Sequence, residues 1–191
     1  LSWYQLTIEP NTAFHRRPPH LPAEDVLGDI QAEGEQQLGA GGFTTYEVSA
    51  WSRGPQAQCR HNLNYWGFGD YLAIGAGAHG KHSDLETGKI SRYWKTRTPR
   101  DYLSRDRDFR AGQRVLSAEE LPGEFMMNAL RLTEGVPSAW FTARTGLEIA
   151  GIAATLENLQ SRELLNWSED GHIAASALGQ RFLDAVVAEF F

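Results

Sequence analysis

The chain has 191 residues, of which 41% are hydrophobic and 22% charged, a composition typical of a globular protein with one large or two small cores. Its formal net charge of −6 argues against general nucleic-acid binding, which requires many cations to neutralise phosphates. No apolar run approaches the roughly 20 residues of a membrane-spanning helix. The single cysteine, Cys59, excludes a disulfide within the chain, so we expect a reducing compartment and a cytoplasmic protein.

The first part of the chain predicts strands separated by a helix. Residues 1–8 alternate in polarity and are rich in β-forming residues, so they predict a strand. Because this predicted strand starts at the first residue, we expect that the chain begins inside a larger domain. After a proline-rich loop, residues 23–38 have the apolar spacing of an amphipathic helix, and residues 43–50 predict a second strand. The order strand, helix, strand favours a parallel, barrel-like sheet.

The middle of the chain is rich in aromatic residues and glycine, and then in basic residues. Residues 71–74 predict a short buried strand, and residues 75–80 match the G-x-G-x-x-G pattern of dinucleotide-binding loops. Such a loop requires a helix directly after it, whereas residues 81–88 are typical of a turn. We therefore interpret the glycines as allowing a close approach of the backbone. Residues 89–114 contain nine of the 18 lysine and arginine residues.

The last part of the chain predicts a helical domain, and we place the domain boundary near Arg114, which gives domains 1–114 and 115–191. The predicted elements are a helix from the capping box Ser117 and Glu120 to about residue 134, helices 138–144 and 147–159, a hairpin of 164–168 and 172–175, and helix 177–190. This order is typical of a winged helix. The candidate recognition helix, 147–159, contains no lysine or arginine, so we favour an interaction module over DNA binding.

The segment 61–66, His-Asn-Leu-Asn-Tyr-Trp, contains the candidate site. A ring nitrogen of His61 can ligate haem iron, and the aromatic rings of Tyr65 and Trp66 can pack against the face of the macrocycle. A lone histidine is more often a structural residue, so the residues themselves leave both interpretations open.

Other candidate ligands also have two interpretations each. Cys59 is either a weaker iron ligand or a small hydrophobic residue. His79 and His82 would need a third ligand to form a metal site, so we interpret them as loop residues. The basic stretch is either a solvated connector or a set of partners for the propionate carboxylates of haem, namely Arg92, Lys95, Arg97 and Arg100.

Four segments together resemble the HemW branch of the oxygen-independent coproporphyrinogen III oxidase family, which is a radical SAM family. The segments are LSWYQLTIEPNT (1–12), YEVSA (46–50), HNLNYW (61–66) and YLAIGAGAHG (71–80). The resemblance extends through residues 95–99 into the C-terminal part, and H-N-x-x-Y-W distinguishes the HemW branch from the true oxidase. It implies an α/β plus α fold, in which the C-terminal portion of a partial (β/α) radical-SAM barrel precedes a helical, winged-helix-like domain.

The resemblance also implies a function. It implies a haem chaperone that delivers haem to respiratory haem proteins, with His61 as the iron ligand and Asn62, Tyr65 and Trp66 around the haem. The alternatives are a radical SAM oxidase that decarboxylates coproporphyrinogen III, and an interaction module that only docks partners.

The resemblance further implies a [4Fe–4S] cluster and S-adenosylmethionine, but only in the full-length protein. The family holds its cluster with a C-x-x-x-C-x-x-C pattern, and Cys59 alone cannot hold one. We therefore expect this chain to lack the cluster-binding half, and we assign it no catalytic residue.

Overall fold

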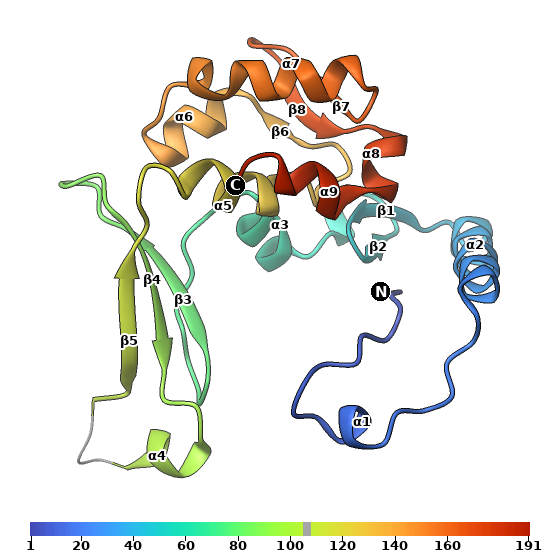
Figure 1. Cartoon of the computed structure of the whole chain (residues 1–191), viewed down its shortest axis with the longest axis horizontal. Helices are drawn as coiled ribbons and strands as arrows, with labels where there is room; N and C mark the ends of the chain where they lie inside the picture. The colour runs from blue at the N-terminus through green and yellow to red at the C-terminus, as the bar shows by residue number, and fades with distance from the viewer. Residues whose placement is uncertain (105–107) are drawn as a thin grey trace. The chain divides into compact units, whose positions relative to one another are not determined.

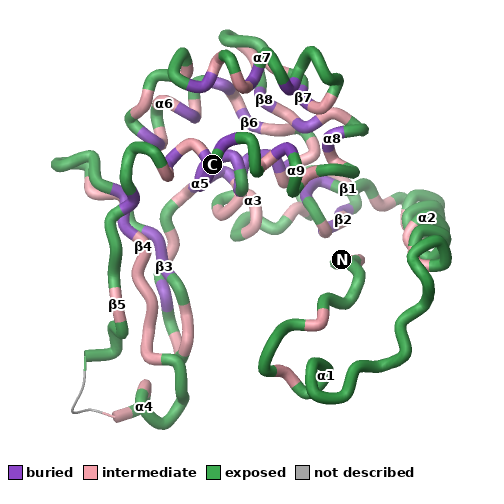
Figure 2. Tube along the Cα trace, in the orientation of Figure 1, coloured by how far each residue is buried: buried purple, intermediate pink, exposed green. Residues whose placement is uncertain are grey.

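The computed structural model describes residues 1–104 and 108–191, which divide into two compact units, Leu1–Gln58 and Cys59–Phe191. Figure 1 shows the elements along the chain, and Figure 2 shows that most buried residues belong to the second unit. Within the described part of the chain, none of the helices has the length and hydrophobicity of a transmembrane segment. The predicted domain boundary near Arg114 falls inside the second unit, and it stays a prediction.

The first unit contains α1 (Ala13–Arg16), α2 (Glu24–Ala40), β1 (Thr44–Glu47), β2 (Ala50–Ser52) and the 3₁₀ turn η1 (Pro55–Ala57). The strand predicted over residues 1–8 is wrong, because Ser2 forms only an isolated bridge with Ala50 and residues 3–8 are not in a strand. The strand predicted over residues 43–50 is instead a hairpin of β1 and β2, which pair antiparallel. The expected parallel order is therefore not found in this unit.

The helix predicted over residues 23–38 is confirmed as α2, with ends that differ by one or two residues. Gly34 of this helix lies against the indole of Trp3, because a Cβ atom at Gly34 would be 2.4 Å from the ring. The aromatic side chain near the start of the chain thus packs on a helix. Alternating polarity predicts a strand only where a neighbouring strand takes up the backbone hydrogen bonds.

The second unit begins with α3 (Arg60–Trp66) and continues into a sheet of β3 (His79–Ser83), β4 (Ile90–Lys95) and β5 (Arg110–Val115). The strands follow the order β3-β4-β5, and both pairs are antiparallel. A short helix, α4 (Pro99–Leu103), lies between β4 and β5 in the chain, at the end of the sheet far from the C-terminal helices (Figure 1). Residues 105–107, which belong to the predicted basic stretch, lie outside the described residues.

The segment between α3 and β3 runs beside the sheet with little regular structure. The strand predicted over residues 71–74 is reduced to one bridge between Tyr71 and Lys81. Gly75 and Gly77 have positive φ angles of 103° and 70°, which glycine adopts readily. The strand β3 begins at His79, so no helix follows the glycines, in agreement with our rejection of a dinucleotide-binding loop.

The helical part of the second unit contains the predicted elements in the predicted order. Its elements are α5 (Leu121–Ala129), β6 (Val136–Pro137), α6 (Ala139–Thr145), the 3₁₀ turn η2 (Ile149–Ile152), α7 (Ala153–Ser161), β7 (Leu165–Trp167), β8 (His172–Ala175), α8 (Ala177–Arg181) and α9 (Leu183–Ala188). The hairpin of β7 and β8 is confirmed, and β6 joins it in the order β6-β8-β7.

Three boundaries in this part differ from the predicted ones. Pro122 lies in the first turn of α5, where its missing N–H leaves no hydrogen bond unmade, and the helix ends at Ala129 instead of near residue 134. The predicted helix 147–159 begins with the 3₁₀ turn η2. The predicted helix 177–190 breaks at Phe182, whose φ and ψ of −121° and 33° are not helical.

The core of the second unit is built on three aromatic rings. The ring of Phe125 in α5 meets the ring of Phe141 in α6 edge-on, with centroids 5.4 Å apart. On its other side Phe125 meets Phe68, which follows α3, at 5.5 Å. Because Phe68 is itself buried, the end of α3 is fixed to the core of the helical part.

Candidate functional site

The helix α3 presents two different faces. His61 and Tyr65 are four residues apart and therefore share one face, with ring centroids 6.3 Å apart. Leu63 and Trp66 lie on another side of the helix and pack against the hydrophobic core. His61 is exposed, whereas Tyr65 is half-buried. One side of the helix is thus packed against the core, and another side exposes the imidazole of His61 to solvent.

Trp66 and Asn62, the other two predicted site residues, are both half-buried. The guanidinium of Arg131 lies over the Trp66 ring at 4.5 Å from its centroid, and the ring of Tyr65 meets Trp66 edge-on at 4.7 Å. The Trp66 ring therefore packs against the Tyr65 ring and helps to hold it in place. Asn62 precedes Trp66 by one helical turn and lies on the same side of α3.

Tyr71 extends the aromatic row that begins on α3. Its ring centroid lies 4.8 Å from that of Tyr65, and its hydroxyl accepts a hydrogen bond of 2.5 Å from Arg92. Burial and the hydrogen bond with Tyr65 raise the pKa of Tyr71 to about 12, against the opposing charge of Arg92. The Tyr71 phenol therefore stays neutral over the physiological pH range.

A buried carboxylate holds two arginines of the sheet. Glu124 in α5 accepts a hydrogen bond of 2.5 Å from Arg92 and one of 3.3 Å from Arg114, while Glu120 also binds Arg114. The side chains of Arg92 and Glu124 are only 16% and 11% exposed. Burial works to lower the pKa of Arg92, but the hydrogen bond and the charge of Glu124 outweigh it and raise that pKa. Arg92 is therefore permanently charged and already paired.

The other basic residues that we considered for propionates lie farther along the sheet and its connection to α4. Lys95 is half-buried, with its ammonium 5.8 Å from the centre of the Tyr93 ring, and Arg97 and Arg100 are exposed. Their role as propionate partners stays a prediction.

An open pocket lies on the face of the sheet that carries Arg92 and Trp94. Its volume of about 340 Å³ is near the lower limit of the usual size for ligand pockets. Its lining consists of Tyr65 and Tyr71, the sheet residues His79, Arg92, Trp94 and Arg114, and Glu124 and Met127 of α5. The imidazole of His79 stacks on the indole of Trp94, with centroids 6.4 Å apart and planes 28° apart. The pocket thus combines aromatic walls with two cations and a histidine.

Six residues of this pocket were not predicted from the sequence: Tyr71, His79, Trp94, Arg114, Glu124 and Met127. The interpretation of His79 as a loop residue is wrong, because His79 is the first residue of β3 and lies opposite Trp94. The spacing of Arg92 and Trp94 could have indicated a shared strand face, but the partners of that face depend on strand register, which the sequence alone does not specify.

Lys81 fixes the segment after α3 to the sheet. Its ammonium donates hydrogen bonds of 2.9 Å to the carbonyl of Phe68 and to the carboxylate of Asp70. Phe68 has a φ of 62°, which is uncommon for a bulky residue, and the Lys81 bond and the buried ring hold it there. Burial lowers the pKa of Lys81 against the opposing effect of Asp70.

The carboxylate of Asp70 should make stability depend on pH. Burial works to raise the pKa of Asp70, but hydrogen bonds from Ser83 and Lys81 outweigh it and lower that pKa. A lowered folded-state pKa contributes stability above the unfolded value of about 3.9, and this contribution is lost as the pH falls through the folded value. We expect Asp70→Asn to be less stable than wild type at pH 6, with the difference shrinking below pH 4. Thermal unfolding midpoints from pH 6 to pH 3 measure this, and a constant difference would contradict it.

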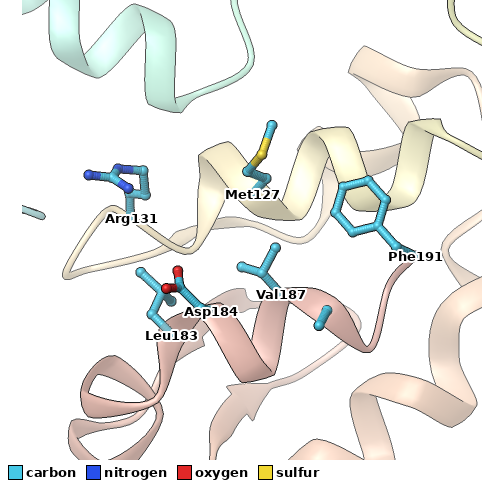
Figure 3. A pocket seen from close by; sticks show the side chains of 7 residues that line it. Met127, Arg131, Leu183, Asp184, Val187 and Phe191 are labelled. Atoms are coloured by element: carbon cyan, nitrogen blue, oxygen red, sulfur yellow. The ribbon is translucent and has the colours of Figure 1, made fainter. Parts of the chain in front are cut away.

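A second hollow lies between α5 and α9 (Figure 3). It has a volume of about 270 Å³, and its lining is mostly apolar: Met127, Arg131, Leu183, Asp184, Val187, Ala188 and Phe191. It adjoins the first pocket at Met127, which belongs to both linings. Its lining contains neither an imidazole nor a thiol, so the pocket with His79 is the better candidate for binding a metal-containing ligand.

The described residues do not fit an iron–sulfur cluster. Cys59 is exposed, and one thiolate cannot hold a [4Fe–4S] cluster. Within residues 1–104 and 108–191, no group of three or more His, Cys, Asp or Glu residues is close enough to hold a metal ion.

Comparison with known sequences identifies relatives over most of the chain. The family model of the HemN C-terminal domain matches residues 116–182. The heme chaperone HemW of Escherichia coli K12 is 52% identical over 147 residues, which cover 77% of this chain and 38% of that protein. The heme chaperone HemW of Haemophilus influenzae is 48% identical over 152 residues, which cover 80% and 39%. The heme chaperone HemW of Buchnera aphidicola subsp. Acyrthosiphon pisum is 35% identical over 196 residues, which cover 100% and 49%.

A solved structure shares the fold. Coproporphyrinogen III oxidase (HemN) from Escherichia coli, described as a radical SAM enzyme, matches with a TM-score of 0.62 at 13% identity. The match covers 88% of this chain and 42% of that chain, and it supports a mixed fold of helices and sheets with no closed barrel. The chain spans between about two fifths and one half of the length of these relatives. By its sequence and its fold, the chain belongs to the HemW-like family of HemN-related proteins.

Proposed function

We propose that this chain binds haem as part of a haem chaperone, with His61 as a ligand of the iron and with Asn62, Tyr65 and Trp66 around it. The observation that supports this most directly is the position of His61 and Tyr65 on one face of α3, beside an aromatic pocket. Relatives that are 35–52% identical are named heme chaperones, and they match 77–100% of this chain.

The residues of the pocket fit the chemistry of haem, which would be the cargo. A porphyrin is flat and largely apolar, and the rings of Tyr65, Tyr71 and Trp94 offer it aromatic surfaces. Its two propionates are anionic, and Arg92 and Arg114 line the same wall. Glu124 and Glu120 already pair with these arginines, but Arg114 is partly exposed and keeps N–H donors that a propionate could use.

The exposure of the site suits a carrier that releases its ligand. His61 is exposed and the pocket is open, so a bound haem would keep one edge accessible to an acceptor protein. We infer that the acceptors are respiratory haem proteins and that the transfer takes place in the cytoplasm. The imidazole of His61 would hold the iron through a ring nitrogen, while Trp66 keeps Tyr65 in place.

We further infer the organisation of the full-length protein. Residues 1–114 would belong to the end of a partial (β/α) radical-SAM barrel with its connecting segment, and residues 115–191 would form a helical, winged-helix-like domain. The order of α5, α6, α7, the β7–β8 hairpin and α8 favours this second domain. A [4Fe–4S] cluster would bind outside the residues of this chain, because Cys59 is its single cysteine, and most of the residues that bind S-adenosylmethionine would lie there too.

Titration with ferric haem, followed by the Soret band, tests the proposal in both this chain and the full-length protein. We expect wild type to bind haem and His61→Ala to bind it at least about tenfold more weakly, a loss of about 1.4 kcal/mol. His20→Ala, which removes an exposed histidine of the first unit, is the control and should bind like wild type. Absence of binding by wild type would contradict the function, and an unchanged Soret band and affinity in His61→Ala would exclude that residue as the ligand.

A second candidate function is oxygen-independent oxidation of coproporphyrinogen III. The structural similarity to HemN favours it, although one fold supports many functions. An anaerobic assay of the full-length protein with S-adenosylmethionine distinguishes the two functions, because only the oxidase would form protoporphyrinogen. Product formation would favour the oxidase over the chaperone.

A further inference from the structure

We propose that His79 is a second haem-iron ligand and that Trp94, on which it stacks, fixes the orientation of its ring. This inference rests on the proposed function. It begins from one observation: His79 belongs to the lining of the pocket, together with Tyr65 and Tyr71, whereas His61 does not. The imidazole inside the pocket is therefore that of β3, and the imidazole of α3 lies next to Tyr65 at its edge.

The strand register places His79 on the correct face of the sheet. His79 lies directly opposite Trp94 in β4, and Trp94 lies opposite Gly112 in β5. A Cβ atom at Gly112 would be 2.2 Å from the Trp94 ring, so glycine leaves the room that this indole occupies. The indole in turn keeps the imidazole plane within 28° of its own. The His79 ring is thus oriented before any ligand arrives.

The ring nitrogens of His79 are available for coordination. His79 is exposed, and no hydrogen bond within the described residues occupies its imidazole. A haem iron accepts axial ligands on both faces of the macrocycle, and imidazole is its commonest protein ligand. Two histidines from different elements, His61 on α3 and His79 on β3, adjoin the rings of Tyr65 and Tyr71. This arrangement suits an iron porphyrin with two axial imidazoles.

The charges next to His79 favour a ligand with carboxylates at one end. Arg92 and Arg114 lie opposite each other, two residue pairs along from Trp94 and Gly112 and therefore on the same face of the sheet. Arg114 is 46% exposed and donates to Glu120 and Glu124 through two of its five N–H groups, so it retains donors for a carboxylate. The macrocycle would lie across the edge of the His79 ring, with its propionates toward Arg114.

The strand also provides a matched control. His82 lies three residues after His79 in β3 and is exposed as well. Because side chains alternate along a strand, His82 projects from the opposite face of the sheet, away from the pocket. Ferric haem is titrated into the wild-type chain, His79→Ala and His82→Ala, and the Soret maximum and the low-temperature EPR signal are recorded.

We expect His79→Ala to shift the Soret maximum, to convert the EPR signal from low-spin to high-spin, and to weaken binding at least about tenfold. His82→Ala should match wild type in all three measurements. Added imidazole should restore the low-spin signal of His79→Ala, a rescue that a merely misfolded variant would not show. A His79→Ala variant with the wild-type spectrum and affinity would overturn the inference and leave the proposed function intact. Absence of haem binding by the wild-type chain would instead refute the proposed function, and the inference with it.

Discussion

Replacing Phe125 by alanine is expected to lower the free energy of unfolding by about 3–5 kcal/mol, the usual cost of removing a buried aromatic side chain. Phe125 is 0% exposed, and its ring lies between those of Phe68 and Phe141. Truncation would leave a cavity at the point where the end of α3 meets the helical part. Urea unfolding followed by tryptophan fluorescence and by circular dichroism measures the change.

Phe182→Ala is the matched control, because Phe182 is 55% exposed at the break between α8 and α9. Substitutions at such positions usually change stability by about 0.5 kcal/mol or less. Equal losses in the two variants would contradict the position of Phe125 at the centre of the core.

Replacing Glu124 by alanine is expected to cost about 3 kcal/mol of unfolding free energy, since removal of one partner leaves a largely buried charge without compensation. The charge left without its partner would be that of Arg92, whose side chain is 16% exposed. Arg92 would keep only its hydrogen bond to Tyr71. Glu124→Gln should lose less, because its amide oxygen can still accept a hydrogen bond from a guanidinium. Urea unfolding of both variants provides the comparison.

Glu120→Ala separates the effect of burial from the effect of charge. Glu120 and Glu124 both bind Arg114, but the side chain of Glu120 is 40% exposed whereas that of Glu124 is 11% exposed. An exposed ion pair contributes little to stability, so Glu120→Ala should be the milder variant. A larger loss for Glu120→Ala than for Glu124→Ala would contradict the assignment of Glu124 as the buried anchor.

Local signals explain why the helical part could be predicted well. The helix α6 ends at Gly146, whose φ of 74° is a conformation that glycine adopts at helix ends, and this signal is readable in the sequence. The β7–β8 hairpin likewise follows from two short apolar runs around the turn at Asp170 and Gly171. Each of these features depends on residues close together in the chain.

Elements that depend on distant partners could not be predicted in the same way. Residues 1–8 alternate like a strand, but their structure was decided by β2 and by Gly34 of α2, far along the chain. The even spacing of Leu178, Phe182 and Val186 predicts one continuous helix, yet the chain turns at Phe182 so that Val186 is buried and Phe182 is exposed.

The candidate site likewise contains features that depend on neighbouring residues and features that depend on distant ones. The segment 61–66 could be singled out because its histidine and aromatic residues are adjacent in the sequence. The position of His79 depends on its pairing with Trp94, 15 residues later, and on the room that Gly112 leaves in β5. Glu124 acts through Arg92, 32 residues before it. Neither relation is readable without strand register and the packing of α5 on the sheet.

Mapping bound ferric haem by NMR tests most directly whether the pocket between α3, the sheet and α5 is the haem site. The paramagnetic iron broadens nearby amide resonances, and zinc protoporphyrin serves as the diamagnetic control. We expect selective broadening at Tyr65, Tyr71, His79 and Trp94, with the β7–β8 hairpin unaffected. Broadening centred on the hollow between α5 and α9, or on the first unit, would contradict the account.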